Sequence, residues 1–378
     1  MNCLCNDTLN LIKLLKKYNY DNLNLNLNLI KITKNKFFMN LYDNMKNILK
    51  KNKVSLNSVI IEKLEEKPLN YLKDSNFTSK NIKNNILSKL KYCYKITNNN
   101  TEIIYFSSKK ILLNKLPTII QHMLILTKLL KVLFDRNIYQ KIIYFETLLK
   151  KKLPKKNNKI LGPNEVNSGL TFIDSIKNGY IILFRKEEIL KVLIHELIHS
   201  NSIDRKIIYS NQMKEFNNIF CSNYKILLNE AFTESLATII NLFYINIHCK
   251  LNKKNLDNMF FNEIKYLNYM CSKIMYYNKI KKISDIIKNN DSCITKFYQY
   301  TNVFSYYILK NILLTNHIEF SKIIEKYNDN YKINNENAIN EIIQLIINNI
   351  NKIDNKIYDV SKDKNKSLRL CLYEIKLL

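Results

Sequence analysis

The sequence has very little glycine, proline, alanine or arginine, and it has no tryptophan. Its 378 residues include 3 Gly and 4 Pro, and only 3 Ala and 4 Arg. Such scarcity of Gly and Pro excludes collagen-like and Pro/Gly-rich low-complexity chains. Lys, Asn, Ile, Tyr and Phe are used instead, all of which have AT-rich codons. This usage is typical of an AT-rich genome, such as that of a large DNA virus or a protist.

The chain also lacks paired cysteine motifs and long uninterrupted apolar runs. Eight cysteines are spread along the sequence without a CxxC pair, so we expect them to be reduced and mostly buried. The N-terminus has no apolar core or cleavage site of a signal peptide. The most apolar stretch, 116–134, is interrupted by Pro117, His122 and two lysines and is too polar to span a bilayer. The sequence therefore predicts a cytoplasmic or virion-associated protein without a transmembrane segment.

Acidic residues are few relative to basic ones. There are 60 Lys+Arg against 32 Asp+Glu, which gives a formal net charge of +28. The hydrophobic fraction of 46% excludes a disordered polyelectrolyte. A basic balance can indicate nucleic acid or an anionic membrane, but nucleic-acid readout relies on arginine and aromatic platforms. With four arginines, we expect the charge to be mainly a solvated lysine surface and a nucleic-acid partner to be unlikely.

The hydrophobic pattern divides the chain into three parts: residues 1–100, 101–250 and 251–378. In the first part, an Asn/Leu alternation at 22–29 has the period of a strand, whereas three- and four-residue spacing predicts amphipathic helices at 36–51, 58–66 and 78–94. We therefore expect a helical N-terminal region. The polar run TNNNT at 97–101 marks its boundary.

The second part is expected to contain strands and the helices that carry the chemistry. Aromatic and β-branched runs predict strands at 102–108 and 139–149, with a helix at 111–134 between them. The Asn178–Gly179 pair predicts a two-residue turn joining strands 170–176 and 180–185, because such turns require positive φ angles. A helix follows from about Glu187. After residue 200 the chain is predicted to be helical, with a loose tail or final strand from residue 354.

Two histidines four residues apart lie inside the helix that begins near Glu187. The segment is His195-Glu196-Leu197-Ile198-His199. Side chains at positions i and i+4 share one helical face, so both imidazoles can bind one ion. Glu196 can then reach a water on that ion and remove its proton, as a zinc hydrolase requires. The alternative is an ordinary histidine pair on an amphipathic helix.

A third ligand is expected from a second helix about thirty residues further on. Its sequence begins Asn229-Glu230-Ala231-Phe232-Thr233-Glu234. Glu230 and Glu234 share a face, so one can bind the metal while the other orients a ligand histidine. Two acids that merely favour a helix N-terminus are the competing interpretation.

The HExxH motif followed by a distant ExxxE resembles the gluzincin zinc metallopeptidases, the thermolysin-like group. The resemblance covers residues 100–315 and implies a Zn²⁺ ion bound by His195, His199 and Glu230. It further implies that Glu196 is the general base and that Glu234 orients His195. The spacer between the motifs is longer than in thermolysin-like enzymes, so the subfamily is left open.

The resemblance also implies two accessory elements. An edge strand that docks the substrate backbone should precede the HExxH helix, which makes Asn167, Ser168 and Gly169 candidate substrate-binding residues. A Tyr or His from a later helix should support the oxyanion, and the preferred candidates are Tyr306 and Tyr307. The further candidates are Tyr300, His248 and His317, although the histidines outside the motif, His122 included, are expected to be structural.

Together these patterns predict an α+β protein with a zincin-like catalytic domain. We expect a small mixed sheet over the HExxH helix, a mainly helical lower half and a helical N-terminal region. The predicted activity is zinc-dependent hydrolysis of peptide bonds in a peptide or protein substrate, with one zinc per chain. The alternatives are a catalytically inactive zinc-binding scaffold and a basic nucleic-acid-binding or virion structural protein. No pattern in the sequence indicates an oligomeric state.

Overall fold

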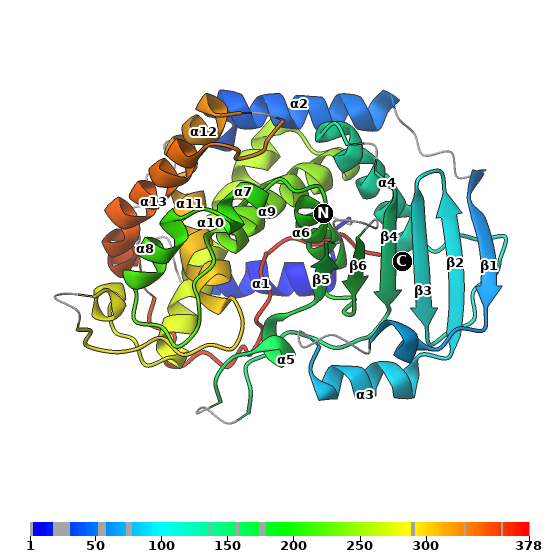
Figure 1. Ribbon diagram of the computed structural model, residues 1–378, viewed down its shortest axis with the longest axis horizontal. Helices are drawn as coiled ribbons and strands as arrows, with labels where there is room; N and C mark the ends of the chain where they lie inside the picture. The colour runs from blue at the N-terminus through cyan, green and yellow to red at the C-terminus, as the bar shows by residue number, and fades with distance from the viewer. Residues whose placement is uncertain are drawn as a thin grey trace.

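The structure is a computed structural model of the chain, drawn in Figure 1. It describes residues 3–17, 31–51, 58–72, 78–136, 138–155, 159–173, 179–288, 292–328, 330–356 and 358–377. A six-stranded mixed sheet lies at one side of the molecule and a body of helices lies at the other. The protein is therefore α+β, as the sequence predicted.

The sheet has the strand order β1-β2-β3-β4-β6-β5. Its strands are β1 (Ile60–Leu64), β2 (Tyr92–Asn98), β3 (Thr101–Ser107), β4 (Gln140–Phe145), β5 (Gly169–Phe172) and β6 (Tyr180–Leu183). β3, β4 and β6 are parallel, whereas β1, β2 and β5 pair antiparallel to their neighbours. β5 is thus an edge strand, as the resemblance implied for the strand that precedes the HExxH helix.

The two faces of the sheet pack against different cores. Successive residues of a strand point to opposite faces, so Ile103 and Tyr105 enter the large core with the helical body, while Ile104 and Phe106 enter a smaller one. α3 (Lys80–Lys89) contributes Ile82 and Ile86 to the smaller core and lies near the lower ends of the central strands in Figure 1. This alternation explains the uniformly apolar, buried central strands.

The helical body surrounds two central helices, α6 (Ile189–Ser200) and α9 (Leu228–His248), which pack against each other. α6 also packs on β5 and β6, which puts it between the sheet and α9. The other α-helices are α1 (Asn6–Lys17), α2 (Lys36–Lys51), α4 (Thr118–Leu133), α5 (Pro163–Val166), α7 (Arg205–Ile208), α8 (Gln212–Asn218), α10 (Lys253–Tyr277), α11 (Lys310–Thr315), α12 (His317–Lys326) and α13 (Glu336–Ile350). None of the helices in the described ranges is both long and apolar enough to cross a membrane.

The predicted helical N-terminal region was wrong in part. α1, α2 and α3 are helical, but 58–66 contains β1, and β2 follows α3 within the predicted helix 78–94. The run at 97–101 is the β2–β3 turn and not a domain boundary, because Asn98 pairs with Thr101. β1 and β2 therefore belong to the same sheet as the later strands. The alternation at 22–29 lies outside the described residues.

Two predictions about local structure were also wrong. Phe172 pairs with Tyr180, so the β5–β6 connection is longer than a two-residue turn. Gly179 has no positive φ; it is needed because a Cβ there would lie 2.1 Å from the carbonyl oxygen of Phe172. The C-terminal segment is no loose tail, since Leu368, Leu370 and Leu372 are buried in the core.

The prediction that the cysteines are all reduced was wrong. Disulfides join Cys3 to Cys249 and Cys221 to Cys293. The two cysteines of each pair are far apart in sequence, with separations of 246 and 72 residues, so no local sequence motif predicts the disulfides. Cys5, Cys93, Cys271 and Cys371 are free, and all but Cys5 are buried.

Candidate metal centre

α6 and α9 bring three metal-ligating side chains to one point. His195 and His199 project from successive turns of α6, and their Nε2 atoms lie 2.9 Å apart. Glu230, in the first turn of α9, places Oε2 at 3.3 Å from Nε2 of His195 and 3.7 Å from Nε2 of His199. All three ligand atoms therefore face the same space, as the sequence predicted.

These spacings fit a bound metal ion. A tetrahedral ion with ligand distances of about 2.0–2.1 Å separates its ligand atoms by about 3.3 Å, close to the three observed distances. His199 and Glu230 keep 11% and 14% of their side-chain surface exposed, so a position beside the ion can be reached from solvent. Among the described residues, these three form a group that could hold a metal.

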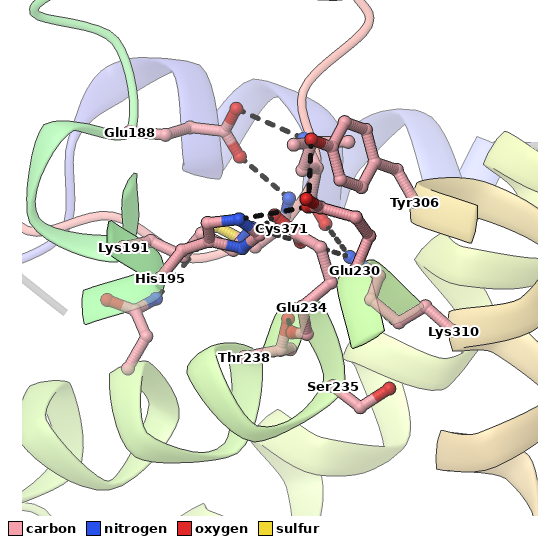
Figure 2. Close-up of polar contacts among 12 residues, drawn as sticks. Glu188, Lys191, His195, Glu230, Glu234, Ser235, Thr238, Tyr306, Lys310 and Cys371 are labelled. Atoms are coloured by element: carbon pink, nitrogen blue, oxygen red, sulfur yellow. Dashed lines mark hydrogen bonds and ion pairs between the residues drawn. The ribbon is translucent and has the colours of Figure 1, made fainter. Parts of the chain in front are cut away.

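The other nitrogen of His195 contacts Glu234, one turn further along α9. Nδ1 lies 3.1 Å from Oε1 of Glu234, and Nε2 of the same ring faces Glu230 (Figure 2). Glu234 in turn contacts the ammonium groups of Lys191 and, at 3.4 Å, Lys310. All three side chains are almost completely buried. The predicted role of Glu234 is thus geometrically possible, and two buried lysines hold it.

His199 has a separate support. Its Nδ1 lies 2.8 Å from Oδ2 of Asp204, which also accepts a hydrogen bond of 3.1 Å from the side-chain amide of Asn229. Asp204 is 1% exposed. A carboxylate therefore lies beside Nδ1 of each imidazole, with hydrogen-bond geometry at His199 but not at His195, and Nε2 of each ring faces the candidate metal position.

The buried charges favour a cation between the histidines. Burial would lower the pKa of His199, but Asp204 and Glu230 outweigh it and raise that pKa well above its usual value. Burial would raise the pKa of Glu230, but the two histidines lower it. The carboxylates around the two rings thus favour positive charge on the histidines, and a bound cation would take the place of their protons.

Glu196 is held against the edge strand β5. The hydroxyl of Thr171 donates to its Oε2 at 2.8 Å, and burial raises the pKa of the Glu196 carboxyl even though both histidines oppose the change. Gly169 lies beside the same carboxylate, since a Cβ there would be 2.8 Å from its Oε1 and 2.9 Å from Leu183. A side chain at position 169 would therefore have to displace the Glu196 carboxylate or Leu183.

The three predicted substrate-binding residues differ in what they can offer. Gly169 begins β5, whose outer edge has no neighbouring strand in the described sheet. Asn167 is already engaged, because its side chain accepts from Thr301 and its carbonyl accepts from Arg185. The carbonyl of Ser168 accepts from the amide of Phe184. The strand that could pair with an extended peptide is therefore 169–172, slightly later than predicted.

Only one of the two preferred tyrosines reaches the centre. The Tyr306 hydroxyl donates to Oε2 of Glu230 at 3.1 Å, and its ring lies edge-on to His195. The next residue, Tyr307, points elsewhere and donates to the carbonyl of Leu368 at 2.6 Å. Both tyrosines lie in the π-helical turn Ser305–Leu309, where adjacent side chains still point in different directions, so only Tyr306 faces the candidate ligands.

The remaining candidates lie away from the metal ligands. Tyr300 is 58% exposed. His248 packs edge-on to His122 and stacks on Tyr244, and His317 packs edge-on to Phe260. The structural role expected for the three histidines is consistent with these contacts.

Four residues of the centre were missed by sequence reasoning: Thr171, Lys191, Asp204 and Lys310. Lys191 did have a detectable signal, because it precedes His195 by four residues and is a lysine on a helix face that is otherwise buried. Asp204, Thr171 and Lys310 are brought in by tertiary packing and had no such signal.

Comparison with known proteins adds one distant relative. The uncharacterized protein R210 of Acanthamoeba polyphaga mimivirus is 29% identical over 189 residues, which are 48% of this chain and 46% of the relative. The chain thus matches less than half of that protein's length. Its source supports the expectation of a viral protein. No family model matches the sequence, and no solved structure matches the fold.

Proposed function

We propose that this protein is a zinc-dependent metallopeptidase. The observation that carries the proposal is the joint placement of His195, His199 and Glu230 around one point, with Glu196 fixed beside it against an edge strand. Two nitrogens and one carboxylate are a ligand set typical of catalytic zinc, which keeps a further position for water or substrate. A metal site with a purely structural role would need neither a carboxylate such as Glu196 beside the ligands nor an unpaired strand edge next to that carboxylate.

The residues have distinct roles in the proposed reaction. An extended peptide pairs with the free edge of β5, which places its backbone next to Glu196. Zinc, when bound, polarises the scissile carbonyl and lowers the pKa of the attacking water. Glu196 takes a proton from that water and passes it to the leaving amine. The hydroxyl of Tyr306 can turn from Glu230 to donate to the oxyanion.

Replacing Glu196 with Gln separates this proposal from its rivals. The amide can still be held by Thr171 but cannot accept a proton, so we expect Glu196→Gln to keep about one zinc per chain and to lose about 10²–10⁴-fold in peptide hydrolysis. The measurements are metal analysis and digestion of a peptide library. Glu215→Gln, on the exposed surface of α8, is the matched control and should retain full activity.

The same experiment distinguishes the alternatives. Zinc without hydrolysis in the wild type would indicate an inactive scaffold. Hydrolysis that is equal in the wild type and Glu196→Gln would remove Glu196 from the mechanism. Absence of zinc, together with saturable polynucleotide binding that weakens steeply with salt, would favour the basic structural protein.

A further inference from the structure

A cavity with a strongly basic lining lies where α6 ends, beyond the metal ligands. Its volume is about 490 Å³, which is within the range of small-ligand sites. Four cationic side chains line it, and no carboxylate is among the described lining residues. The four cationic side chains are those of Arg136, Arg205, Lys206 and Lys332.

The positions of the four arginines single out this cavity in a chain that otherwise uses lysine. Arg185 is buried and donates to the carbonyls of Asn164 and Asn167. Arg369 is buried and pairs with Glu374. Both are therefore explained by the fold. The other two, Arg136 and Arg205, line the same cavity although they are far apart in sequence.

Most of this positive charge is not neutralised by the protein. Lys206 pairs with Glu336 at 3.2 Å. Within the described ranges, Arg136, Arg205 and Lys332 have no carboxylate partner, and Nε of Arg136 is buried without a hydrogen-bond acceptor. The nearby carboxylate of Asp204 is turned to His199. Three cations thus face a cavity that contains no compensating acid.

The cavity wall is fixed by the core beneath it. Ile203 and Ile333 are fully buried, and the amide of Ile333 donates to the carbonyl of Ile203 at 3.3 Å. This contact holds the segment of Lys332 against that of Arg205. Cations beside the C-terminal ends of α4 and α6 also complement the helix dipoles, but lysine would serve that purpose equally well. The Arg205 guanidinium also lies 6.0 Å from the centroid of the Tyr209 ring, but no such contact is found for Arg136 among the described residues, and its guanidinium requires a different explanation.

We propose that this cavity binds a phosphate group of a small ligand. Guanidinium presents a planar fork of donors that matches phosphate oxygens two at a time, which an ammonium cannot do. Three uncompensated cations fit an anion of more than one negative charge. The site is separate from the metal ligands and does not depend on the proposed peptidase activity.

The decisive variant keeps the charge and changes the geometry. In Arg136→Lys/Arg205→Lys the net charge stays at +28, so non-specific attraction is unchanged. We expect titration calorimetry with pyrophosphate to show saturable binding to the wild type and at least about 10-fold weaker binding to this variant, because the paired donors are lost. Inorganic phosphate should bind more weakly than pyrophosphate. Malonate is a dicarboxylate with a charge similar to that of inorganic phosphate, and it should bind more weakly than either phosphate compound.

Lys46→Ala provides the matched charge control. Lys46 is exposed on α2 and does not line the cavity, so its loss lowers the net charge by one and should leave pyrophosphate affinity unchanged. Arg205→Lys alone, at an exposed position, keeps the test valid if Arg136→Lys impairs folding. Equal affinity of the wild type and the lysine variants, non-saturable binding, or equal binding of malonate would overturn the proposal.

Discussion

Glu230 and Glu234 are the same residue type, one turn apart on the same helix, yet they lie in different surroundings. Glu230 keeps 14% of its side chain exposed and contacts His195, His199 and the Tyr306 hydroxyl. Glu234 is 3% exposed and lies between Lys191, Lys310 and Nδ1 of His195. The first carboxylate faces the metal position, whereas the second is enclosed in the core.

In the proposed metal site, this difference would let a single helix supply both a ligand and its support. A carboxylate that binds a metal needs access to the metal position, and its hydrogen bonds in the metal-free protein must be replaceable by the metal. A supporting carboxylate needs permanent partners. Buried lysines meet that need, because separating them from Glu234 costs a large amount of free energy. We therefore expect substitutions at the two positions to affect different quantities, namely metal affinity at Glu230 and stability at Glu234.

The largest effect is expected from Glu234→Ala on the free energy of unfolding. The substitution leaves Lys191 and Lys310 buried without their common partner, which costs about 3–5 kcal/mol. Urea unfolding of the metal-free protein measures it, with Glu230→Ala as the matched control. If Glu230→Ala destabilised the metal-free protein more than Glu234→Ala, the assigned roles would be reversed.

The next effect concerns zinc affinity and should have the opposite order. Glu230→Ala removes one of three protein ligands, so we expect zinc to bind more than about 100-fold less tightly. Glu234→Ala affects only the orientation of His195 and should cost about 10–100-fold. Competition with a chromogenic chelator gives both values. Tighter zinc binding by Glu230→Ala than by Glu234→Ala would identify Glu234 as the ligand.

The two histidine supports provide a finer comparison. Asp204→Asn keeps an oxygen that can accept from Nδ1 of His199, and Asp204 has no lysine partner in the described structure, so zinc affinity should fall by only about 10-fold. Glu234→Gln makes the same chemical change beside two buried lysines. It should therefore reduce stability clearly more than Asp204→Asn, as thermal unfolding would show. Equal losses would mean that the lysines do not distinguish the two supports.

The smallest effect is expected from the adjacent tyrosines. Tyr306→Phe removes a hydrogen bond to Glu230 worth about 1 kcal/mol, so zinc dissociation should change by less than about 10-fold, whereas peptide turnover should fall further if the hydroxyl supports the oxyanion. Tyr307→Phe is the control, because its hydroxyl bonds to Leu368 and should affect stability alone. Steady-state kinetics and thermal unfolding separate the two outcomes.

The parts of the site that the sequence revealed are those within one helix. The spacing of His195, Glu196 and His199 and that of Glu230 and Glu234 fix shared faces through helix geometry alone. Asp204, Thr171 and Lys310 were not found, because their contacts depend on how α6 packs against β5, α9 and α11. Local periodicity contains no information about such packing.

The fold follows the same rule. The central strands β3 and β4 and the helices α2, α4, α6 and α9 were predicted because they are long or strongly apolar. β1 was mistaken for a helix because it is short and largely exposed. Its residues therefore do not have to alternate between apolar and polar side chains. The β2–β3 turn was mistaken for a domain boundary because a polar run has the same composition in either setting.

The buried C-terminal segment has a consequence for the time at which the centre can form. Lys310 donates to the carbonyl of Leu370 as well as to Glu234, and Glu188 accepts from the amides of Leu370 and Cys371 (Figure 2). During synthesis at about 5–20 residues per second, the 140 residues from Glu230 to Leu370 take roughly 7–28 s to follow. The ligands therefore leave the ribosome well before their support is complete. If the proposed zinc site is correct, His195 and Glu234 would be present before Lys310 is held by the last segment, and we expect full zinc affinity only after that segment has docked.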